Sequence, residues 1–374
     1  MKEIIFNTDI YSFDTFREFV EEFQVDEQDL IITNAFILTD SVRQGLKADV
    51  ICQEQYGAGE PSDEMVEAMY GEISSMKPHK RIIGIGGGTV LDISKLFALK
   101  YVHPVEELYD GKLPVEKDKE LVLIPTTCGT GSEVTNISIL AFQKRNTKMG
   151  LATDKLYADK AVLIPEFLGN LPFRFFATSS VDAFIHGVES SLSPKATPYT
   201  ELYGYKAVEI ILKGYQMIAR EGEQARNRIL KEFLIASNFA GLAFGTAGCG
   251  PVHALSYPLG GTFHVAHGEA NYAVFSGVME HYQKKAGVRL ESLERLKAHM
   301  ASVLDCKEEQ VLEELETLLG AVIRKKSLKE YGADQEMLKV WSQSVLDTQQ
   351  RLMKNSPFEL GYEDVLHIYQ SLFE

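Results

Sequence analysis

A change of hydrophobic pattern near residue 172 constrains the fold of this chain more than any other feature. Before that point, short apolar runs rich in β-branched residues alternate with stretches that have helical spacing. After it, the strand-like runs disappear and apolar residues recur at steps of three and four, the spacing of amphipathic helices. The pattern predicts a parallel sheet with flanking helices, followed by an all-α domain.

The first part of the chain contains five apolar runs that are short enough to be strands. The expected strands are 30–33, 48–52, 81–85, 121–124 and 161–164. Between the second and the third, Pro61 and two acidic residues open a segment with helical spacing, which predicts an amphipathic helix. This arrangement indicates a βαβ unit within a parallel sheet.

The second part contains two clear helical faces. One is formed by Val208, Ile211, Leu212, Tyr215 and Ile218, and the other by Leu290, Leu293, Leu296, Met300, Val303 and Leu304. We therefore expect an α/β domain over residues 1–173 and an all-α domain over residues 174–374.

The charge balance narrows the range of partners. The chain has 374 residues with 53 acidic and 38 basic side chains, a net charge of −15, so nucleic acid is not expected as a partner. It has no apolar run near the ~18 residues of a membrane span and no basic, apolar leader at its start. The four cysteines lie far apart, which predicts neither a disulfide framework nor a thiolate metal site and favours a cytoplasmic location.

Two loops rich in glycine and hydroxyl residues follow predicted strands. Gly84, Gly86, Gly87 and Gly88 lead into a helix, where backbone N–H groups could approach a pyrophosphate. The second loop, 125–135, could line a phosphate, a ribose or a nicotinamide. The alternatives are a tight turn and a loop that caps the next helix. Two such loops after strands of one α/β domain favour a ligand site.

Carboxylate and imidazole side chains form a candidate metal site in the helical part. Asp182 and His186 are four residues apart, so they share one face of a helix. Three of the nine histidines lie between His253 and His267, and Pro258, Gly260 and Gly261 are expected to break the helix there so that the segment turns back.

The resulting set of one carboxylate and three imidazoles, Asp182, His186, His253 and His267, suits Fe²⁺, Zn²⁺, Mn²⁺ or Co²⁺. Taken alone, the spacing of Asp182 and His186 is more typical of an exposed polar pair than of a metal site. The remaining histidines, at 79, 103, 281, 299 and 367, occur singly and are expected to be ordinary surface or core residues.

Four motifs in this order closely resemble the iron-containing (group III) alcohol dehydrogenases. They are GGGTVLDISK at 86–95, PTTCGTGSEVT at 125–135, DAFIH at 182–186 and HALSYPLG with a later HG at 253–268. The resemblance covers essentially the whole chain. It implies the dehydroquinate synthase-like fold of that family, with a dinucleotide-binding first domain and a metal-binding and catalytic second domain. It also implies NAD as cofactor, Fe²⁺ or alternatively Zn²⁺ as metal, and the four ligands just named.

The resemblance also implies a set of cofactor-binding residues: Asn34, Gly86, Gly87, Gly88, Thr89, Asp92, Thr126, Thr127, Thr130, Ser132, Val134 and Lys148. Two positions depart from the family pattern. Tyr257 stands where many relatives have a histidine, which puts a proton relay there in doubt. Asn34 stands where NAD-selective relatives often have aspartate, so NAD is expected with possible tolerance of NADP. Tyr257 and His264 are candidates for proton handling or substrate contact, or for support of the ligand histidines.

The expected reaction is hydride transfer between NAD(H) and a small alcohol or aldehyde, helped by a metal acting as Lewis acid. Within the family, the resemblance carried by the segments EPSDEM at 60–65 and HGEANY at 267–272 implies 4-hydroxybutyrate and succinic semialdehyde as substrates. Lys148 and Arg174 are candidate partners for the substrate carboxylate. Alternatives are a dehydrogenase of butanol, 1,3-propanediol or lactaldehyde, a lyase of the dehydroquinate synthase-like fold, and a non-catalytic metal-binding protein. A homo-oligomer is expected.

Overall fold

The computed structural model describes residues 3–145, 147–285 and 290–374. The chain divides into two compact units, Phe6–Leu171 and Pro172–Glu374, and residues 3–5 belong to the second unit. Thr197 Oγ1 donates a 2.7 Å hydrogen bond to the Glu3 carbonyl, which attaches this first segment to the second unit. The sequence places the boundary between residues 173 and 174.

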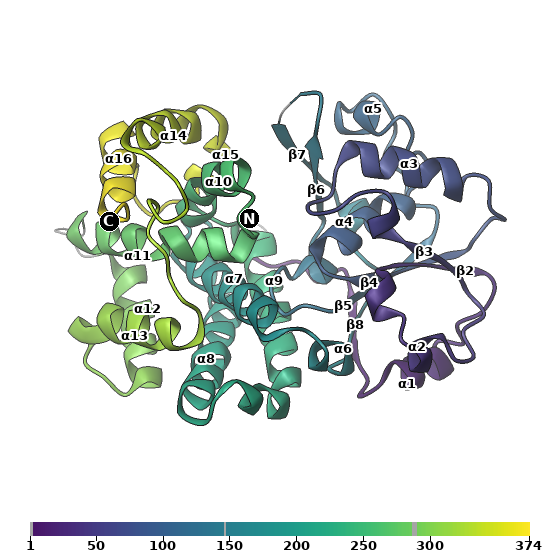
Figure 1. Cartoon of the computed structure of the whole chain (residues 1–374), viewed down its shortest axis with the longest axis horizontal. Coiled ribbons are helices and arrows are strands. Elements are labelled where there is room, and N and C mark those ends of the chain that lie inside the picture. Colours follow the sequence, from purple (N-terminus) through teal and green to yellow (C-terminus); the bar gives the residue numbers. More distant parts are fainter. Residues whose placement is uncertain (1–2, 146, 286–289) are drawn as a thin grey trace. The chain divides into compact units, whose positions relative to one another are not determined.

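The first unit is built on a six-stranded parallel sheet with the order β1-β8-β5-β4-β2-β3 (Figure 1). Its strands are β1 (Asp9–Ser12), β2 (Asp29–Thr33), β3 (Asp49–Cys52), β4 (Arg81–Gly86), β5 (Glu120–Pro125) and β8 (Lys160–Leu163). An antiparallel hairpin is formed by β6 (Ile137–Phe142) and β7 (Thr147–Ala152). The predicted parallel sheet and its five strands are confirmed, whereas β1 and the hairpin were not predicted.

Alternating side chains of the strands bury two apolar clusters, one on each face of the sheet. Ile82 belongs to the cluster with helices α3, α4 and α5, and its neighbour Ile83 to the cluster with α1, α2 and α6. The helices of this unit are α1 (Phe16–Glu22), α2 (Asp40–Arg43), α3 (Asp63–Ile73), α4 (Gly88–Phe97), α5 (Val105–Tyr109) and α6 (Glu166–Gly169). Helix α3 is the predicted amphipathic helix, and Ser62 caps it by accepting from the Met65 amide.

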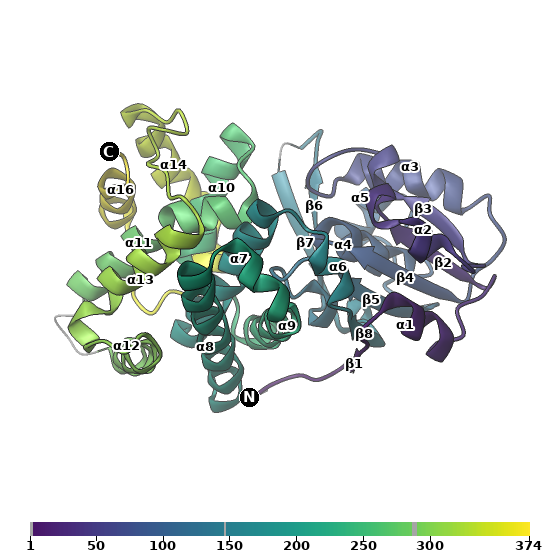
Figure 2. The same ribbon diagram turned by 60° about the horizontal axis from the view of Figure 1, so that its bottom comes forward.

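The second unit is helical throughout its described residues, as its apolar spacing predicts. Its longer helices are α7 (Phe173–Leu192), α8 (Pro198–Glu221), α9 (Leu230–Ala247), α10 (Pro251–Phe263), α11 (His267–Lys285), α12 (Glu291–Leu304), α13 (Val311–Val322), α14 (Gln335–Thr348) and α16 (Tyr362–Ser371), with the short α15 (Gln350–Met353). Helices α7, α8 and α9 pack side by side in both views (Figures 1 and 2).

The expected helix break at Pro258 is wrong. Helix α10 continues through Pro258, Gly260 and Gly261 and ends at Phe263. A proline removes one N–H donor, and this helix tolerates the loss because most of its residues up to Leu259 are buried against neighbours. The chain turns directly after α10, where His264 adopts a left-handed conformation with φ of 53°. Helix α11 then starts at His267.

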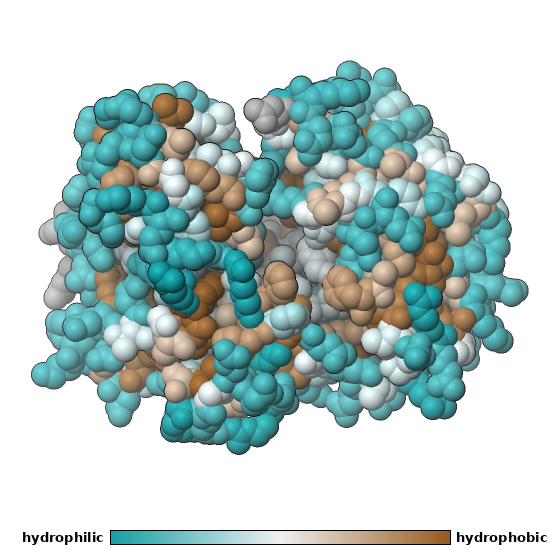
Figure 3. Space-filling view, in the orientation of Figure 1, coloured by the Kyte–Doolittle hydropathy of each residue, from teal (hydrophilic) through white to brown (hydrophobic). Residues whose placement is uncertain are grey.

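The apolar side chains of both units are mostly internal. On the face shown in Figure 3, hydrophilic residues cover much of each unit and hydrophobic residues form small groups between them. Among the described residues, no single helix is long and apolar enough to cross a membrane. Only α9 and α10 pass that test together, as a pair bent by 106°.

Candidate functional site

Helix α7 carries the first two predicted ligands in the core of the helical unit. From Val181 to Leu192 every side chain of this helix is buried. Asp182 and His186, one turn apart, are therefore 3% and 4% exposed rather than forming the alternative exposed pair. A carboxylate and an imidazole this deeply buried need polar or charged partners.

His253 lies at the centre of the cluster formed by Asp182, His186, His253 and His267, which we call the buried group. It lies in the first turn of α10 and is 3% exposed. Its Nδ1 is 2.6 Å from Glu189 Oε2, while its Nε2 is 3.7 Å from Asp182 Oδ1 and has no hydrogen-bond partner among the described residues. A buried ring nitrogen without a hydrogen bond is uncommon and indicates a position for an atom that the protein itself does not supply.

His267 comes to the same point from the start of α11. Its Nε2 is 3.8 Å from Asp182 Oδ1, and Asn271 Nδ2 lies between them, 2.7 Å from that oxygen and 3.3 Å from Nε2. Gly268 makes this approach possible, because a β-carbon there would stand 1.9 Å from the Thr178 carbonyl oxygen. Donor atoms of Asp182, His253 and His267 all lie within 4.8 Å of one another.

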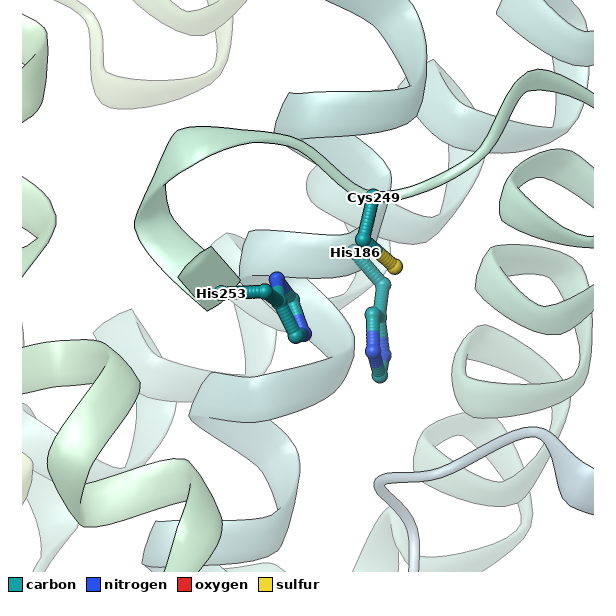
Figure 4. A group of neighbouring side chains, drawn as sticks. All are labelled: His186, Cys249 and His253. Carbon is teal, nitrogen blue, oxygen red and sulfur yellow. The ribbon is translucent and has the colours of Figure 1, made fainter. Parts of the chain in front are cut away.

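His186 joins the group through His253. The two rings stack with centroids 4.6 Å apart, and the other face of His186 meets Phe244. Cys249 completes a second set of donor atoms within 4.8 Å of one another, with His186 and His253 (Figure 4). The four predicted ligands are thus brought together in two overlapping sets that share His253. Cys249 was expected to have no metal-binding role.

The electrostatics of the group favour positive charge. Burial alone would raise the pKa of Asp182, but the three neighbouring imidazoles outweigh it and hold that pKa well below its ordinary value. Burial alone would lower the pKa of His253, whereas the nearby carboxylates of Asp182 and Glu189 raise it to about 9. The two buried carboxylates, Asp182 and Glu189, therefore favour a cation at this point.

Tyr257 and His264 differ in their distance from this group. The Tyr257 ring lies 6.2 Å from that of His267, centroid to centroid. His264 is exposed at the end of α10 and belongs to neither set of clustered donor atoms among the described residues. The geometry favours Tyr257 over His264 as a neighbour of a bound substrate.

The two glycine-rich loops lie side by side in the α/β unit. Strands β4 and β5 pair in register to their ends, where Gly86 faces Pro125, and the Thr126 amide donates to the Gly86 carbonyl at 3.0 Å. Helix α4 then begins after Gly87 with no side chain capping its N-terminus. The chain order reverses between β2 and β4, and ligands of open α/β sheets bind beyond the strand ends at such a point.

A buried lysine fixes the second loop to α4. Lys95 is fully buried, and its Nζ donates to Ser132 Oγ and to the Ile137 carbonyl, both at 2.7 Å. Asp92 accepts from Ser132 Oγ at 2.6 Å and from the Ile139 amide at 3.0 Å. Asp92 thus bonds to Ser132 in the loop and to the backbone that follows it, so these side chains hold the loop against α4.

The remaining predicted cofactor residues lie around the same strand ends. Asn34 follows β2 and donates to Glu54 Oε2 at 3.0 Å, and Thr89 Oγ1 donates to the Gly59 carbonyl. Thr127 and Thr130 lie against Gly87 and Gly88, and Val134 is buried. Of the two candidate carboxylate partners, Lys148 pairs with Glu60 at 2.5 Å and Arg174 with Glu269 at 3.0 Å.

Sequence reasoning missed four residues that complete these sites. Glu189, Asn271, Cys249 and Lys95 bond to, or lie beside, predicted site residues. Helical spacing offered a signal for two of them, because Glu189 follows Asp182 by seven residues and Asn271 follows His267 by four. Lys95 is the last residue of the motif at 86–95, three positions after Asp92, whereas Cys249 carried no comparable signal.

Comparison with known proteins identifies the class to which this fold and these clusters belong. Residues 2–165 match the family model described as iron-containing alcohol dehydrogenase, and residues 176–373 match that of the C-terminal part of the iron-containing alcohol dehydrogenase family. The chain belongs to the iron-containing alcohol dehydrogenase family, which confirms the resemblance seen in its motifs.

Among similar proteins, a 4-hydroxybutyrate dehydrogenase of Clostridium kluyveri is 44% identical over the full length of both chains. A long-chain-alcohol dehydrogenase of Geobacillus thermodenitrificans is 34% identical over 78% of this chain and 74% of its own. A sulfoacetaldehyde reductase from Bifidobacterium kashiwanohense, solved with NAD⁺, shares the fold with a TM-score of 0.85 at 19% identity, covering 100% of this chain and 98% of its own.

Proposed function

We propose that this enzyme interconverts 4-hydroxybutyrate and succinic semialdehyde with NAD(H) as hydride carrier. The observation that carries the general reaction is the buried group around the unpartnered Nε2 of His253, which suits a catalytic metal. The substrate rests on the 44% identity, over its whole length, to the 4-hydroxybutyrate dehydrogenase of Clostridium kluyveri. NAD rests on the family and on the NAD⁺ complex of the sulfoacetaldehyde reductase.

The proposed metal ligands are Asp182, His186, His253 and His267. One carboxylate and three imidazoles suit Fe²⁺, and Zn²⁺ is the alternative. The unpartnered Nε2 of His253 and the two buried carboxylates, Asp182 and Glu189, both suit a divalent cation. Bound there, such an ion would act as a Lewis acid that makes the substrate hydroxyl more acidic and the aldehyde carbonyl more electrophilic.

The chain's own residues supply the rest of the chemistry. In the oxidative direction a hydride passes from the alcohol carbon to NAD⁺ and a proton is released, giving aldehyde, NADH and H⁺. The amides at the start of α4 would hold the pyrophosphate, and the loop fixed by Lys95 would orient the rest of the cofactor. Asn34 itself offers no carboxylate to repel a 2′-phosphate, so NAD is the proposed cofactor and tolerance of NADP is left to be tested.

Gly87→Val should weaken NADH binding by at least roughly tenfold, about 1.4 kcal/mol. A β-carbon at Gly87 would lie 3.5 Å from the Thr127 methyl group, an ordinary contact, so the fold accepts it. The loss would come from obstruction of the backbone that contacts the pyrophosphate. Fluorescence titration with NADH measures it, with Gly71→Val on α3 as a control in the same unit. Unchanged affinity in Gly87→Val would place the phosphates elsewhere.

The substrate proposal predicts a preference for the hydroxy acid. Steady-state kcat/KM should be at least roughly tenfold higher for 4-hydroxybutyrate than for 1-butanol, because a protein group that binds the carboxylate has nothing to bind in butanol. Equal or faster oxidation of 1-butanol would overturn the substrate and leave the dehydrogenase intact. NADH that does not accumulate would instead favour a lyase of this fold.

Butanol, 1,3-propanediol and lactaldehyde remain the alternative substrates within the family. The cytoplasmic location, the homo-oligomeric assembly and the lack of nucleic-acid and membrane partners, all expected from the sequence, stay predictions. Size-exclusion chromatography with light scattering would measure the assembly.

A further inference from the structure

Glu189 is a buried carboxylate that makes three hydrogen bonds in the helical unit. It lies near the end of α7, and its side chain is 5% exposed. Its Oε2 accepts from the Gly250 amide at 2.9 Å and from His253 Nδ1 at 2.6 Å, and its Oε1 accepts from the Val252 amide at 2.6 Å. One side chain thus binds both the start of α10 and the ring that α10 carries.

We infer that Glu189 is a positioning residue that makes Nε2 the only nitrogen of His253 able to bind the catalytic metal. The inference rests on the proposed role of His253 as a ligand. An imidazole bound to a metal through one nitrogen keeps its proton on the other. Because Nδ1 donates to Glu189, the lone pair of the ring is at Nε2, which lies near Asp182 and has no other partner.

The carboxylate fixes the ring more firmly than a single hydrogen bond would. Glu189 binds the backbone amides on either side of Pro251 and also the ring of His253, so the ring cannot rotate without breaking its bond to a carboxylate that the α10 backbone holds in place. Gly250 leaves room for this arrangement, since a β-carbon there would lie 3.1 Å from Glu189 Oε1. An anionic acceptor also makes a bound imidazole a stronger donor to a metal.

Glutamine at position 189 tests this role with little change of shape. A carboxylate offers two acceptor oxygens to the three N–H groups, whereas an amide offers one oxygen and turns an NH₂ group toward at least one of the donors. Either an α10 amide loses its acceptor, or His253 must rotate or protonate its other nitrogen. We expect Glu189→Gln to weaken Zn²⁺ binding by roughly 10- to 100-fold.

The measurement is calorimetric titration of the metal-free full-length protein with Zn²⁺ in competition with a chelator. Glu201→Gln is the matched control, because Glu201 accepts from Arg295 at 2.7 Å in the same unit and is not part of the buried group. Zn²⁺ affinity of Glu201→Gln should stay within threefold of the wild type. Thermal unfolding of each metal-free variant shows separately how much α10 has been destabilised.

A second measurement needs no variant. In Zn²⁺-loaded wild-type protein with ¹⁵N-labelled histidine, NMR should show His253 bound to the metal through Nε2, with a slowly exchanging proton on Nδ1. Binding through Nδ1 would overturn the inference.

An unchanged Zn²⁺ affinity in Glu189→Gln with a lowered melting temperature would also overturn it, leaving Glu189 as a helix cap only. If instead His253→Ala keeps its metal, the proposed ligand set itself is wrong. The two failures are therefore distinguishable.

Discussion

Replacing His253 by alanine is expected to empty the metal centre and to lower kcat/KM by at least roughly a thousandfold, about 4 kcal/mol. Both sets of clustered donor atoms contain this residue, so no combination of the remaining groups replaces it. Its loss also leaves the Asp182 carboxylate buried with one imidazole fewer, which weakens the attraction for any cation at this point.

Elemental analysis after dialysis, together with NADH production from 4-hydroxybutyrate, decides the outcome. His299→Ala is the matched control, because His299 lies in the same unit, bonds the Tyr205 carbonyl at 3.0 Å and takes no part in the buried group. The control should keep both metal and activity. Full metal occupancy in His253→Ala would contradict the ligand assignment, whatever happens to the rate.

The strands that could be predicted are those whose residues are buried on both faces of the sheet, because such residues must be apolar. The residues of β2, β4 and β5 are almost all buried, so they are continuous apolar runs that are easily recognised. Strand β1 escaped prediction because all four of its residues are exposed at the sheet edge. The hairpin strand β7 is also largely exposed and carries little apolar alternation.

The clustering of the four proposed ligands could be predicted because metal chemistry limits which side chains can serve as ligands and helical spacing shows which can meet. The course of the chain between them could not. Proline and glycines read locally as a break, yet packing of α10 outweighs the missing bond at Pro258, and His264 supplies the turn instead. Tertiary contacts, which cannot be read from the local sequence, decided that the helix continues through Pro258 and that the chain turns at His264.

The supporting residues were the hardest to foresee, because their partners are distant in the sequence. Glu189 binds donors 61 to 64 residues away, and Lys95 binds acceptors 37 to 42 residues away. Neither forms a motif with its partners. Only the fold reveals that such a charged side chain is buried and hydrogen-bonded rather than exposed to water.

Lys95→Met is expected to destabilise the protein by about 3 kcal/mol and to weaken NADH binding as the second loop loosens. Methionine has nearly the length of lysine and fills the same space, so the effect isolates the charge. Burial lowers the pKa of Lys95, although Asp92 counteracts it. Removing the ammonium leaves the Ile137 carbonyl without this donor and Asp92 without its cation. The lower end of the range for a broken buried pair applies because Asp92 is 15% exposed and keeps two other donors.

Urea unfolding of the metal-free protein measures the change, with Lys100→Met as control. Lys100 is half-exposed and pairs with Glu116 at 3.6 Å, so its replacement should stay within about 0.5 kcal/mol. The double variant Lys95→Met with Asp92→Asn should recover part of the loss, because it removes the uncompensated carboxylate as well. If the double variant instead loses more free energy of unfolding than the two single variants lose together, the ion pair is not what holds the loop. The loop would then depend on the hydroxyl of Ser132 and on the backbone bonds of η3 (Ser132–Val134), which begins at Gly131 in a left-handed conformation with φ of 57°.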